Sequence, residues 1–443
     1  MPLASRTVDS SFSPQGDRVV TARCILSGSY EVLQQWTNHT GQILVWEVAT
    51  GEPLLELQPG LVSFEREPVF EEDDDGLRWG TRCVHTVEWS PTGHQILAIS
   101  YSHTEHPSLV RVFNALNGDI LAAWPPTVSP SLSISHPAWS PDAKEVAVVT
   151  TPSKEALAAG ETEAYSVCVC DPLTGAAKRM IVSGQVEAPD NAGVHYSPDG
   201  QMILLGYKHC VHIRSARTGD LMWSRAKPDS LVCGCSWSPQ SNRVLIGVGE
   251  AHAHSQGALI TTITGTNDTV SYICAKDCQR LQTWGSAWSP QGGEWIVCGV
   301  LSGGISLHNT TSGKFKLRLC EEEVSVPEQP PLCSLNDWPQ LCWRGNTISG
   351  VSDQGMVCSW GIEACTGKPV TFHFFAEATA DTISSITRRR VEKLLPFATF
   401  LLQCRHRLQG NGNICGYIAE YVLPLWTSPA ERRYVAALAD GRQ

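Results

Sequence analysis

Histidine pairs and cysteine pairs are the groups in this sequence whose residue types could bind a metal. Among them are His103 and His106, His252 and His254, and Cys274 and Cys278. A structural zinc site needs four such ligands, and a catalytic site needs three and an open position. No matching second pair completes any of these sets, so we expect incidental histidines and thiols and no metal site.

Motifs of the common catalytic sites are also missing. The sequence has no glycine-rich phosphate loop, no His-Glu-x-x-His, no Cys-x-x-Cys and no Gly-x-Ser-x-Gly. Nucleotide binding, zinc hydrolysis, thiol exchange and serine catalysis depend on these spacings. We therefore expect that the protein is not an enzyme and binds no cofactor.

The charge of the chain limits the kind of partner. Its 443 residues are 42% hydrophobic and 17% charged, with a formal net charge of −11. A nucleic-acid binder needs a basic surface, so nucleic acid is not the expected partner. Residues 384–443 carry nine Lys/Arg and four Asp/Glu. This end is therefore basic and the rest of the chain is acidic, which favours a different partner for each.

The cysteines and the lack of long apolar runs indicate a compartment. The 17 cysteines are an odd number without a framework spacing, which is typical of reduced thiols rather than of disulfides. No uncharged apolar run approaches the roughly 20 residues of a membrane helix. The first residues show no secretion signal. We expect a cytoplasmic or nuclear protein without a membrane contact.

A Ser-Pro turn recurs along the chain, directly after an aromatic residue. The copies lie at 12–16, 89–93, 139–143, 196–200, 237–241 and 288–292, with a degraded copy at 343–346. Proline presets the backbone of the turn, and Asp or Gly completes it. Short apolar segments rich in β-branched residues follow the turns, which predicts a β-strand on each side.

A second repeat lies downstream of each Ser-Pro turn. It consists of an alternating strand, a Thr-Gly or related turn, and another strand. The copies lie at 43–51, 110–118, 167–175, 211–219, 305–313 and 357–367, with a weaker copy at 259–265. The two repeats together predict four antiparallel strands in each of seven units of about 40–50 residues. One such sheet cannot bury both of its faces, so the units must stack around an axis.

Together with QILVWEVATGEPL at 42–54, the pattern resembles the WD-repeat β-propeller family over about residues 5–375. The resemblance implies an all-β fold, a seven-bladed β-propeller of four-stranded antiparallel blades that serves as a binding platform. The repeats are divergent, because no copy has the full Trp-Asp pair and the strand-end pair of the first is Trp46-Glu47. We therefore expect that the family's polar tetrad is missing and that packing holds the blades together.

The chain is expected to have two parts. Residues 1–376 form the propeller, and residues 377–443 form a basic extension. Apolar residues such as Val391, Leu394, Leu401 and Leu408 recur at helical spacing in the extension, and Pro396 interrupts them. This pattern predicts short α-helices. They either cover a blade edge or dock onto a second protein.

Length variation in the repeats points to one face of the disc. The variable segments are 24–41, 58–84, 101–108, 150–164, 249–257 and 320–340. In the WD-repeat arrangement they lie opposite the short turns, and loops on a rigid scaffold often carry function. The alternative is neutral drift of loop length. Aromatic and charged residues near the starts of the units are the candidate partner-binding residues: Trp79, Arg82, His85, Asp190, Asp229, Trp284 and Trp338.

These patterns favour a non-catalytic scaffold or adaptor for protein–protein interaction. We expect it to bind a protein segment on the long-loop face. Acidic runs at 71–75 and 321–323 make basic segments one candidate ligand. The alternative is a substrate receptor of a ubiquitin ligase complex, docked through the C-terminal helices. The sequence leaves the identity of the partner and the oligomeric state open.

Overall fold

Strands and tight turns make up all of the chain that the structure describes. The computed structural model describes residues 4–26, 40–57, 84–100, 109–124, 132–152, 165–185, 189–207, 209–226, 231–249, 255–263, 270–274, 281–290, 292–300, 305–312, 315–319, 340–351, 356–361 and 369–374. Within these ranges there are 28 strands and no helix, so the all-β prediction is confirmed. The helical extension predicted at 377–443, and the ligase docking assigned to it, lie outside the described residues.

Four strands that follow one another in sequence form each sheet, and neighbouring strands are antiparallel. Blade 1 contains β1 (Ala4–Phe12), β2 (Arg18–Leu26), β3 (Thr40–Glu47) and β4 (Pro53–Leu57). Blade 2 contains β5 (Val84–Trp89), β6 (Gln95–Ser100), β7 (Leu109–Asn114) and β8 (Ile120–Trp124). Blade 3 contains β9 (Leu132–Trp139), β10 (Val146–Pro152), β11 (Tyr165–Cys170) and β12 (Ala177–Gln185).

The remaining described strands repeat the same order. Blade 4 contains β13 (Pro189–Tyr196), β14 (Met202–Tyr207), β15 (Cys210–Ser215) and β16 (Leu221–Ala226). Blade 5 contains β17 (Leu231–Trp237), β18 (Arg243–Gly249), β19 (Ser255–Thr262) and β20 (Val270–Cys274). Blade 6 contains β21 (Leu281–Trp288), β22 (Trp295–Val300), β23 (Ile305–Asn309) and β24 (Phe315–Leu319). Blade 7 contains β25 (Gln340–Arg344), β26 (Thr347–Val351), β27 (Met356–Gly361) and β28 (Pro369–Phe374).

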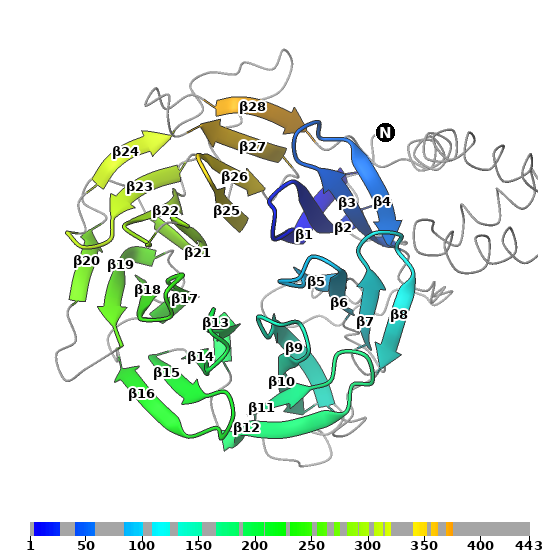
Figure 1. The fold of residues 1–443 in the computed structure, drawn as a ribbon, viewed down its shortest axis with the longest axis horizontal. Helices are drawn as coiled ribbons and strands as arrows, with labels where there is room; N and C mark the ends of the chain where they lie inside the picture. Colours follow the sequence, from blue (N-terminus) through cyan, green and yellow to red (C-terminus); the bar gives the residue numbers. More distant parts are fainter. Residues whose placement is uncertain are drawn as a thin grey trace, which may run out of the picture.

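The sheets are arranged as a ring around one axis (Figure 1). The first strand of each sheet is nearest the centre and the fourth is on the rim. The expected propeller of four-stranded antiparallel sheets is confirmed, and the described residues form seven such sheets. None of these sheets combines strands from the two ends of the chain. Blade 7 instead packs on blade 1, where Val351 joins Val19 and Trp46 in one buried cluster.

The two kinds of short turn lie on the same face of the ring, which we call the turn face. Backbone hydrogen bonds between them show this directly. In blade 1 the Val48 amide, after β3, donates to the Asp17 carbonyl, before β2, over 2.9 Å. The same bond joins Ala115 to His94, Ala216 to Gln201, Ile263 to Asn242 and Thr310 to Glu294. Because strands alternate in direction, each inner strand begins on the opposite face, which we call the loop face.

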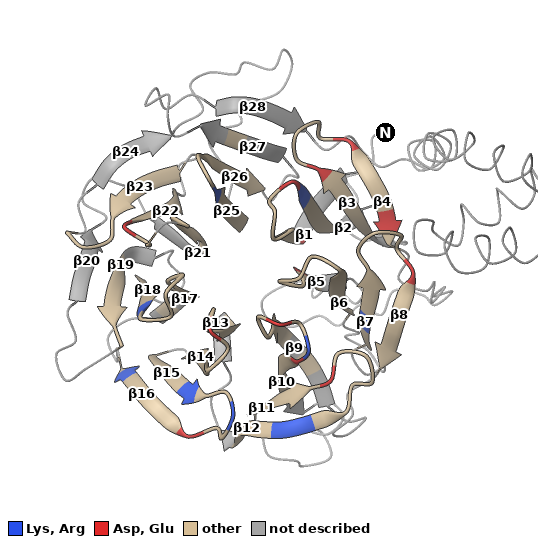
Figure 2. Ribbon diagram, viewed as in Figure 1, with Lys and Arg blue, Asp and Glu red and all other residues tan. Residues whose placement is uncertain are grey.

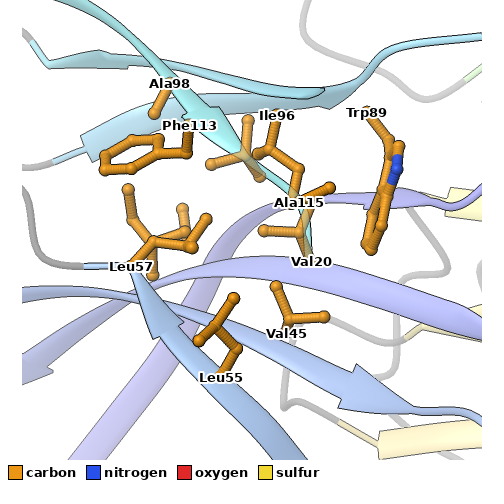
Figure 3. Packing of buried hydrophobic residues seen from close by; sticks show 12 residues of the cluster. Val20, Val45, Leu55, Leu57, Trp89, Ile96, Ala98, Phe113 and Ala115 are labelled. Atoms are coloured by element: carbon orange, nitrogen blue, oxygen red, sulfur yellow. The ribbon is translucent and has the colours of Figure 1, made fainter. Parts of the chain in front are cut away.

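The core of the protein consists of the seams between blades. In the seam of blades 1 and 2, Val45 and Leu57 from one sheet pack against Trp89, Ile96 and Phe113 from the next (Figure 3). Burying one side chain of this size contributes about 1.5–3 kcal/mol. Equivalent clusters join blades 2 and 3, 3 and 4, 4 and 5, and 5 and 6. Apolar packing between blades therefore holds the ring together, as the sequence predicts.

Blade 1 keeps one polar contact within the blade, although the sequence predicted that the polar tetrad is missing. The buried indole of Trp46 donates a 2.8 Å hydrogen bond to the hydroxyl of Thr21 on the neighbouring strand. In blade 2 the same strand position holds Phe113, which has no polar atom to offer. A hydrogen-bonded aromatic thus persists in one blade and is replaced by an apolar one in the next.

In blades 2, 3 and 4 the turn after the third strand also packs on the outer strand of the preceding blade. Gly175, in the turn of blade 3, has a φ of +70°, and a Cβ there would lie 2.5 Å from Cδ2 of Trp124 on β8. The Trp124 indole donates to the Pro172 carbonyl of the same turn over 2.9 Å. Glycine is therefore favoured at this position for two reasons: the backbone has a positive φ, and the Trp124 indole leaves no room for a Cβ.

We expect Gly175→Ala to lower the free energy of unfolding by about 2–4 kcal/mol, because backbone strain and overpacking add. Gly345→Ala is the matched control, since Gly345 has a φ of +51° and nothing within 4 Å of a new Cβ. That variant should lose only the backbone cost of about 1 kcal/mol. Denaturant unfolding followed by tryptophan fluorescence measures both, and equal losses would contradict the seam contact.

Candidate functional site

The structure places three of the predicted partner-binding residues on inner strands. His85 is the second residue of β5, Asp190 the second of β13 and Trp284 the fourth of β21. These strands belong to blades 2, 4 and 6, and each begins on the loop face. Three separate blades thus contribute one candidate each. All three lie in the half of an inner strand that is nearer the loop face. Trp79, Arg82, Asp229 and Trp338 lie outside the described residues.

A second group of inner-strand residues was not predicted. These residues are polar and partly exposed, and they stand one to three positions before the aromatic residue that ends the strand. They are Asp9, Ser11, Thr86, Glu88, His136, His195, Ser236 and Ser286. The signal was present in the sequence, because the repeated aromatic fixes the register of each inner strand. These residues were missed because the sequence analysis followed the repeated apolar and aromatic residues and not the polar residues between them.

Inner-strand side chains bond to the backbone of the next inner strand. Asp9 accepts a 2.9 Å hydrogen bond from the Val87 amide, and Ser11 accepts one of 2.9 Å from the Trp89 amide. Across the next seam, the Trp139 indole donates to the Glu88 carbonyl over 3.3 Å. Blades 1, 2 and 3 are therefore connected near the axis by polar bonds as well as by the apolar seams.

Two carboxyl groups of this inner layer are held away from water. Burial raises the pKa of Asp9 to about 7, against two backbone hydrogen bonds that lower it. Burial raises the pKa of Glu88 to about 8, and the charge of Asp9 adds to the effect. The Oε2 atom of Glu88 is buried and has no hydrogen-bond partner. Burial therefore opposes the ionisation of both groups near neutral pH, which is unusual for carboxyls.

Two histidines of blades 3 and 4 lie close to one glycine. A Cβ at Gly193 would be 3.5 Å from Nε2 of His195 and 3.8 Å from Nδ1 of His136. His136 has a φ of +45°, a conformation that non-glycine residues rarely adopt. The inner strands of blades 3 and 4 therefore carry histidines, which can donate or accept hydrogen bonds. Those of blades 1 and 2 carry the carboxyl groups of Asp9 and Glu88.

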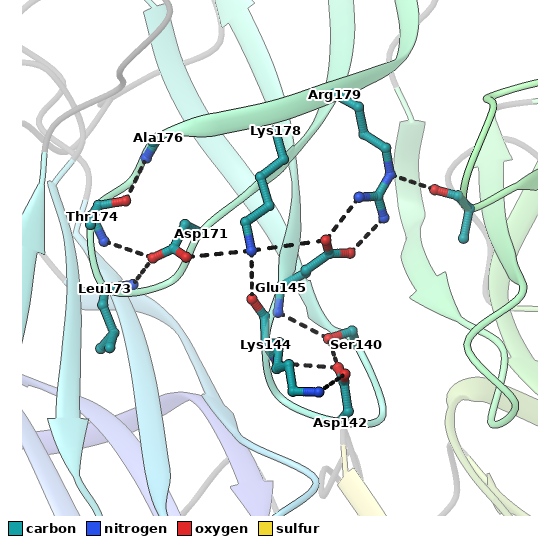
Figure 4. Close-up of polar contacts among 11 residues, drawn as sticks. Ser140, Asp142, Lys144, Glu145, Asp171, Leu173, Thr174, Ala176, Lys178 and Arg179 are labelled. Atoms are coloured by element: carbon teal, nitrogen blue, oxygen red, sulfur yellow. Dashed lines mark hydrogen bonds and ion pairs between the residues drawn. The ribbon is translucent and has the colours of Figure 1, made fainter.

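The turn face carries an ion-pair cluster between blades 3 and 4 (Figure 4). Arg179 on β12 donates to Glu145 through both terminal nitrogens, over 2.8 and 2.5 Å, and its Nε donates to the Ala216 carbonyl of blade 4 over 2.6 Å. The Arg179 hydrogen bonds hold the pKa of Glu145 below its usual range. Lys178 lies between Asp171 and Glu145, at 3.4 and 3.9 Å. These charges neutralise one another, so the cluster is structural.

Metal binding and thiol chemistry find no support in the described ranges. No group of three His, Cys, Asp or Glu side chains comes together there. Cys168 and Cys170 are buried on β11, and burial raises the pKa of the Cys170 thiol to about 12. A protonated, buried thiol is a poor nucleophile. The histidines at 103, 106, 252 and 254 are not among the described residues.

No membrane-spanning helix is found in the part of the chain that the structure describes.

Comparisons with known proteins identify the fold and no family. No protein-family model matches the sequence, and no curated protein matches it. By contrast, 1645 chains of solved structures match. One belongs to the crystal structure of the mitotic checkpoint complex, with a TM-score of 0.52 and 13% identity over 80% of this chain and 89% of that chain. An identity this low shows a shared fold and does not assign a function.

The raised pKa of Glu88 predicts a pH-dependent stability. The unfolded chain loses this proton near its ordinary pKa of about 4.3, whereas the folded chain keeps it until about pH 8. The free energy of unfolding therefore falls as the pH rises between these values and levels off above them. Glu88→Gln cannot ionise, so its stability relative to the natural chain should rise between pH 5 and pH 8 by about 3 kcal/mol.

Denaturant unfolding at both pH values measures this change, and comparison across pH cancels any fixed cost of the amide. Glu52→Gln, at an exposed carboxylate, is the control for replacing a surface glutamate by its amide. A Glu88→Gln chain that follows the natural chain across the whole pH range would show that Glu88 ionises normally.

The Arg179 ion pair predicts a stability difference between two basic residues of one cluster. Arg179→Met removes a bidentate pair and a bond to blade 4, and should cost about 1–3 kcal/mol. Lys144→Met removes a pair with Asp142 whose side chains are 78% and 55% exposed, and should cost less than about 0.5 kcal/mol. Thermal melting of the two variants gives the comparison, and similar melting temperatures would argue against a role for Arg179 between blades.

Proposed function

We propose that this chain is a divergent WD-repeat propeller that acts as a non-catalytic scaffold and binds a protein segment on its loop face. The observation that carries the proposal is the placement of His85, Asp190 and Trp284. They come from blades 2, 4 and 6, yet all stand in the loop-face half of the inner strands. A ring that brings inner-strand positions of several blades to one face suits recognition of one segment.

The charge of the chain favours a basic segment. Asp190, one of the three loop-face candidates, is acidic. The acidic balance of the chain outside its C-terminal part also favours a basic partner. Members of this fold class serve many functions, so the assignment rests on the site and not on the fold.

The loop-face assignment predicts which variants lose partners. The pair of substitutions His85→Glu and Asp190→Lys changes the charge at two inner-strand starts and should lower cross-linked partner recovery by about tenfold. Lys144→Glu changes the charge on the turn face at an exposed side chain and should leave recovery unchanged. Quantitative mass spectrometry of proteins captured by the full-length chain measures both.

Two controls keep this experiment decisive. Thermal melting establishes that both variants fold. Hydrogen exchange of the natural chain with a captured partner should show protection at the starts of β5, β13 and β21. Loss of partners from Lys144→Glu alone, or protection confined to the turn face, would overturn the assignment of the loop face.

A further inference from the structure

The rim of blade 4 differs from the other rims whose side chains are described. Its outer strand β16 has no buried residue, and Leu221 and Met222 are 52% and 59% exposed. The outer strand of blade 1, β4, buries two of its five residues, and β8 of blade 2 also buries two of five. Ile120 and Leu121 of β8 are also exposed, but β16 alone of these three strands buries none of its residues.

The backbone edge of β16 accompanies the exposed apolar side chains. Among the described strands, β16 pairs with β15 and with no other. Such an edge presents free amide and carbonyl groups that can pair with another strand, and proteins usually protect it with proline, lysine or inward charges. β4 carries Pro53 and Glu56. Neither β8, Ile-Leu-Ala-Ala-Trp, nor β16, Leu-Met-Trp-Ser-Arg-Ala, has a proline, and β16 differs from β8 in carrying a basic residue, Arg225.

The apolar surface continues across the seam onto blade 3. Met180 on β12 is 42% exposed. The turn that precedes β16 is fixed on this part of β12, because Arg179 donates to the Ala216 carbonyl and a Cβ at Gly219 would lie 2.9 Å from the Ile181 carbonyl oxygen. Leu221 follows that turn directly. Met180, Leu221 and Met222 therefore lie on adjoining parts of the rim.

The charges of this rim define the partner. The strands β12, β15 and β16 contain only basic charged residues, as Figure 2 shows in blue: Lys178, Arg179, Arg214 and Arg225. The ion pairs of the described chain neutralise Lys178 and Arg179. Arg214 and Arg225 instead donate to uncharged groups, the Gly219 carbonyl over 2.8 Å and the Thr261 hydroxyl over 3.4 Å, and so keep their positive charge. Arg217, in the turn before β16, is exposed and is also outside these ion pairs. Asp220 is the one acidic residue of this turn.

We propose that the edge of β16 is a second docking surface, where an extended protein segment with alternating apolar and acidic side chains adds as a fifth strand of blade 4. Main-chain hydrogen bonds to β16 supply affinity in this mode, and alternate side chains supply specificity. The apolar side chains contact Met180, Leu221 and Met222. The acidic side chains face Arg217 and Arg225. This surface lies on the rim and is separate from the loop face.

Two synthetic peptides test the proposal with the full-length chain. One alternates valine with glutamate and the other alternates valine with lysine. The glutamate peptide should bind at least about tenfold more tightly, because opposite charges attract and like charges repel across the interface. Hydrogen exchange should show that this peptide protects amides of β16. Equal binding of both peptides, no binding of either, or protection only elsewhere would overturn the proposal.

Variants at matched exposed positions locate the surface. Met222→Asp should weaken binding of the glutamate peptide by about tenfold, whereas Ile120→Asp, at a 48% exposed residue of β8, should not change it. Arg217→Glu should reduce the preference for glutamate over lysine. Both aspartate variants change exposed side chains, and melting temperatures establish that they fold. Equal effects of Met222→Asp and Ile120→Asp would contradict an edge specific to blade 4.

Discussion

Each blade of this protein has a sheet with two apolar faces, and no blade can bury both by itself. The structure meets this constraint by making the seams between blades its core: Phe113 of blade 2 packs against Leu57 of blade 1, and Val149 of blade 3 is in one cluster with Leu205 of blade 4. Everything else in the ring depends on these seams. The inner strands are held around one axis, and the turns are held on one face, because the faces between them are buried.

Polar contacts then distinguish one seam from another. The seam of blades 1 and 2 has Asp9 and Ser11 bonded to backbone amides. The seam of blades 5 and 6 has Arg243, whose guanidinium lies 5.3 Å from the Trp288 ring and donates to the Gly293 carbonyl over 2.7 Å. A common apolar scaffold with individual polar contacts allows each blade to differ without loss of the ring. Functional surfaces can therefore develop on single blades or across neighbouring ones.

Local turn chemistry made much of the fold predictable. The repeated aromatic and Ser-Pro pattern predicted strands that end at Trp89 and Trp237, and the structure ends β5 and β17 there. The Thr-Gly repeats predicted a turn between two strands, and Gly175 lies in such a turn between β11 and β12. The bond from Asp9 to Val87 was not predictable, because it joins residues 78 apart across a seam. The pairing of Trp46 with Thr21 was also missed, since it depends on strand register.

The contact between Val19 and Val351 has a consequence for how the ring forms. Every other seam joins blades that follow one another in sequence, so each can form by a short loop closure soon after its neighbour. The seam of blades 7 and 1 instead joins opposite ends of the described chain and carries the largest closure entropy. An assembly of partly formed blades therefore remains an open arc, with one apolar face exposed at each end. Completion of the ring covers both faces in a single step.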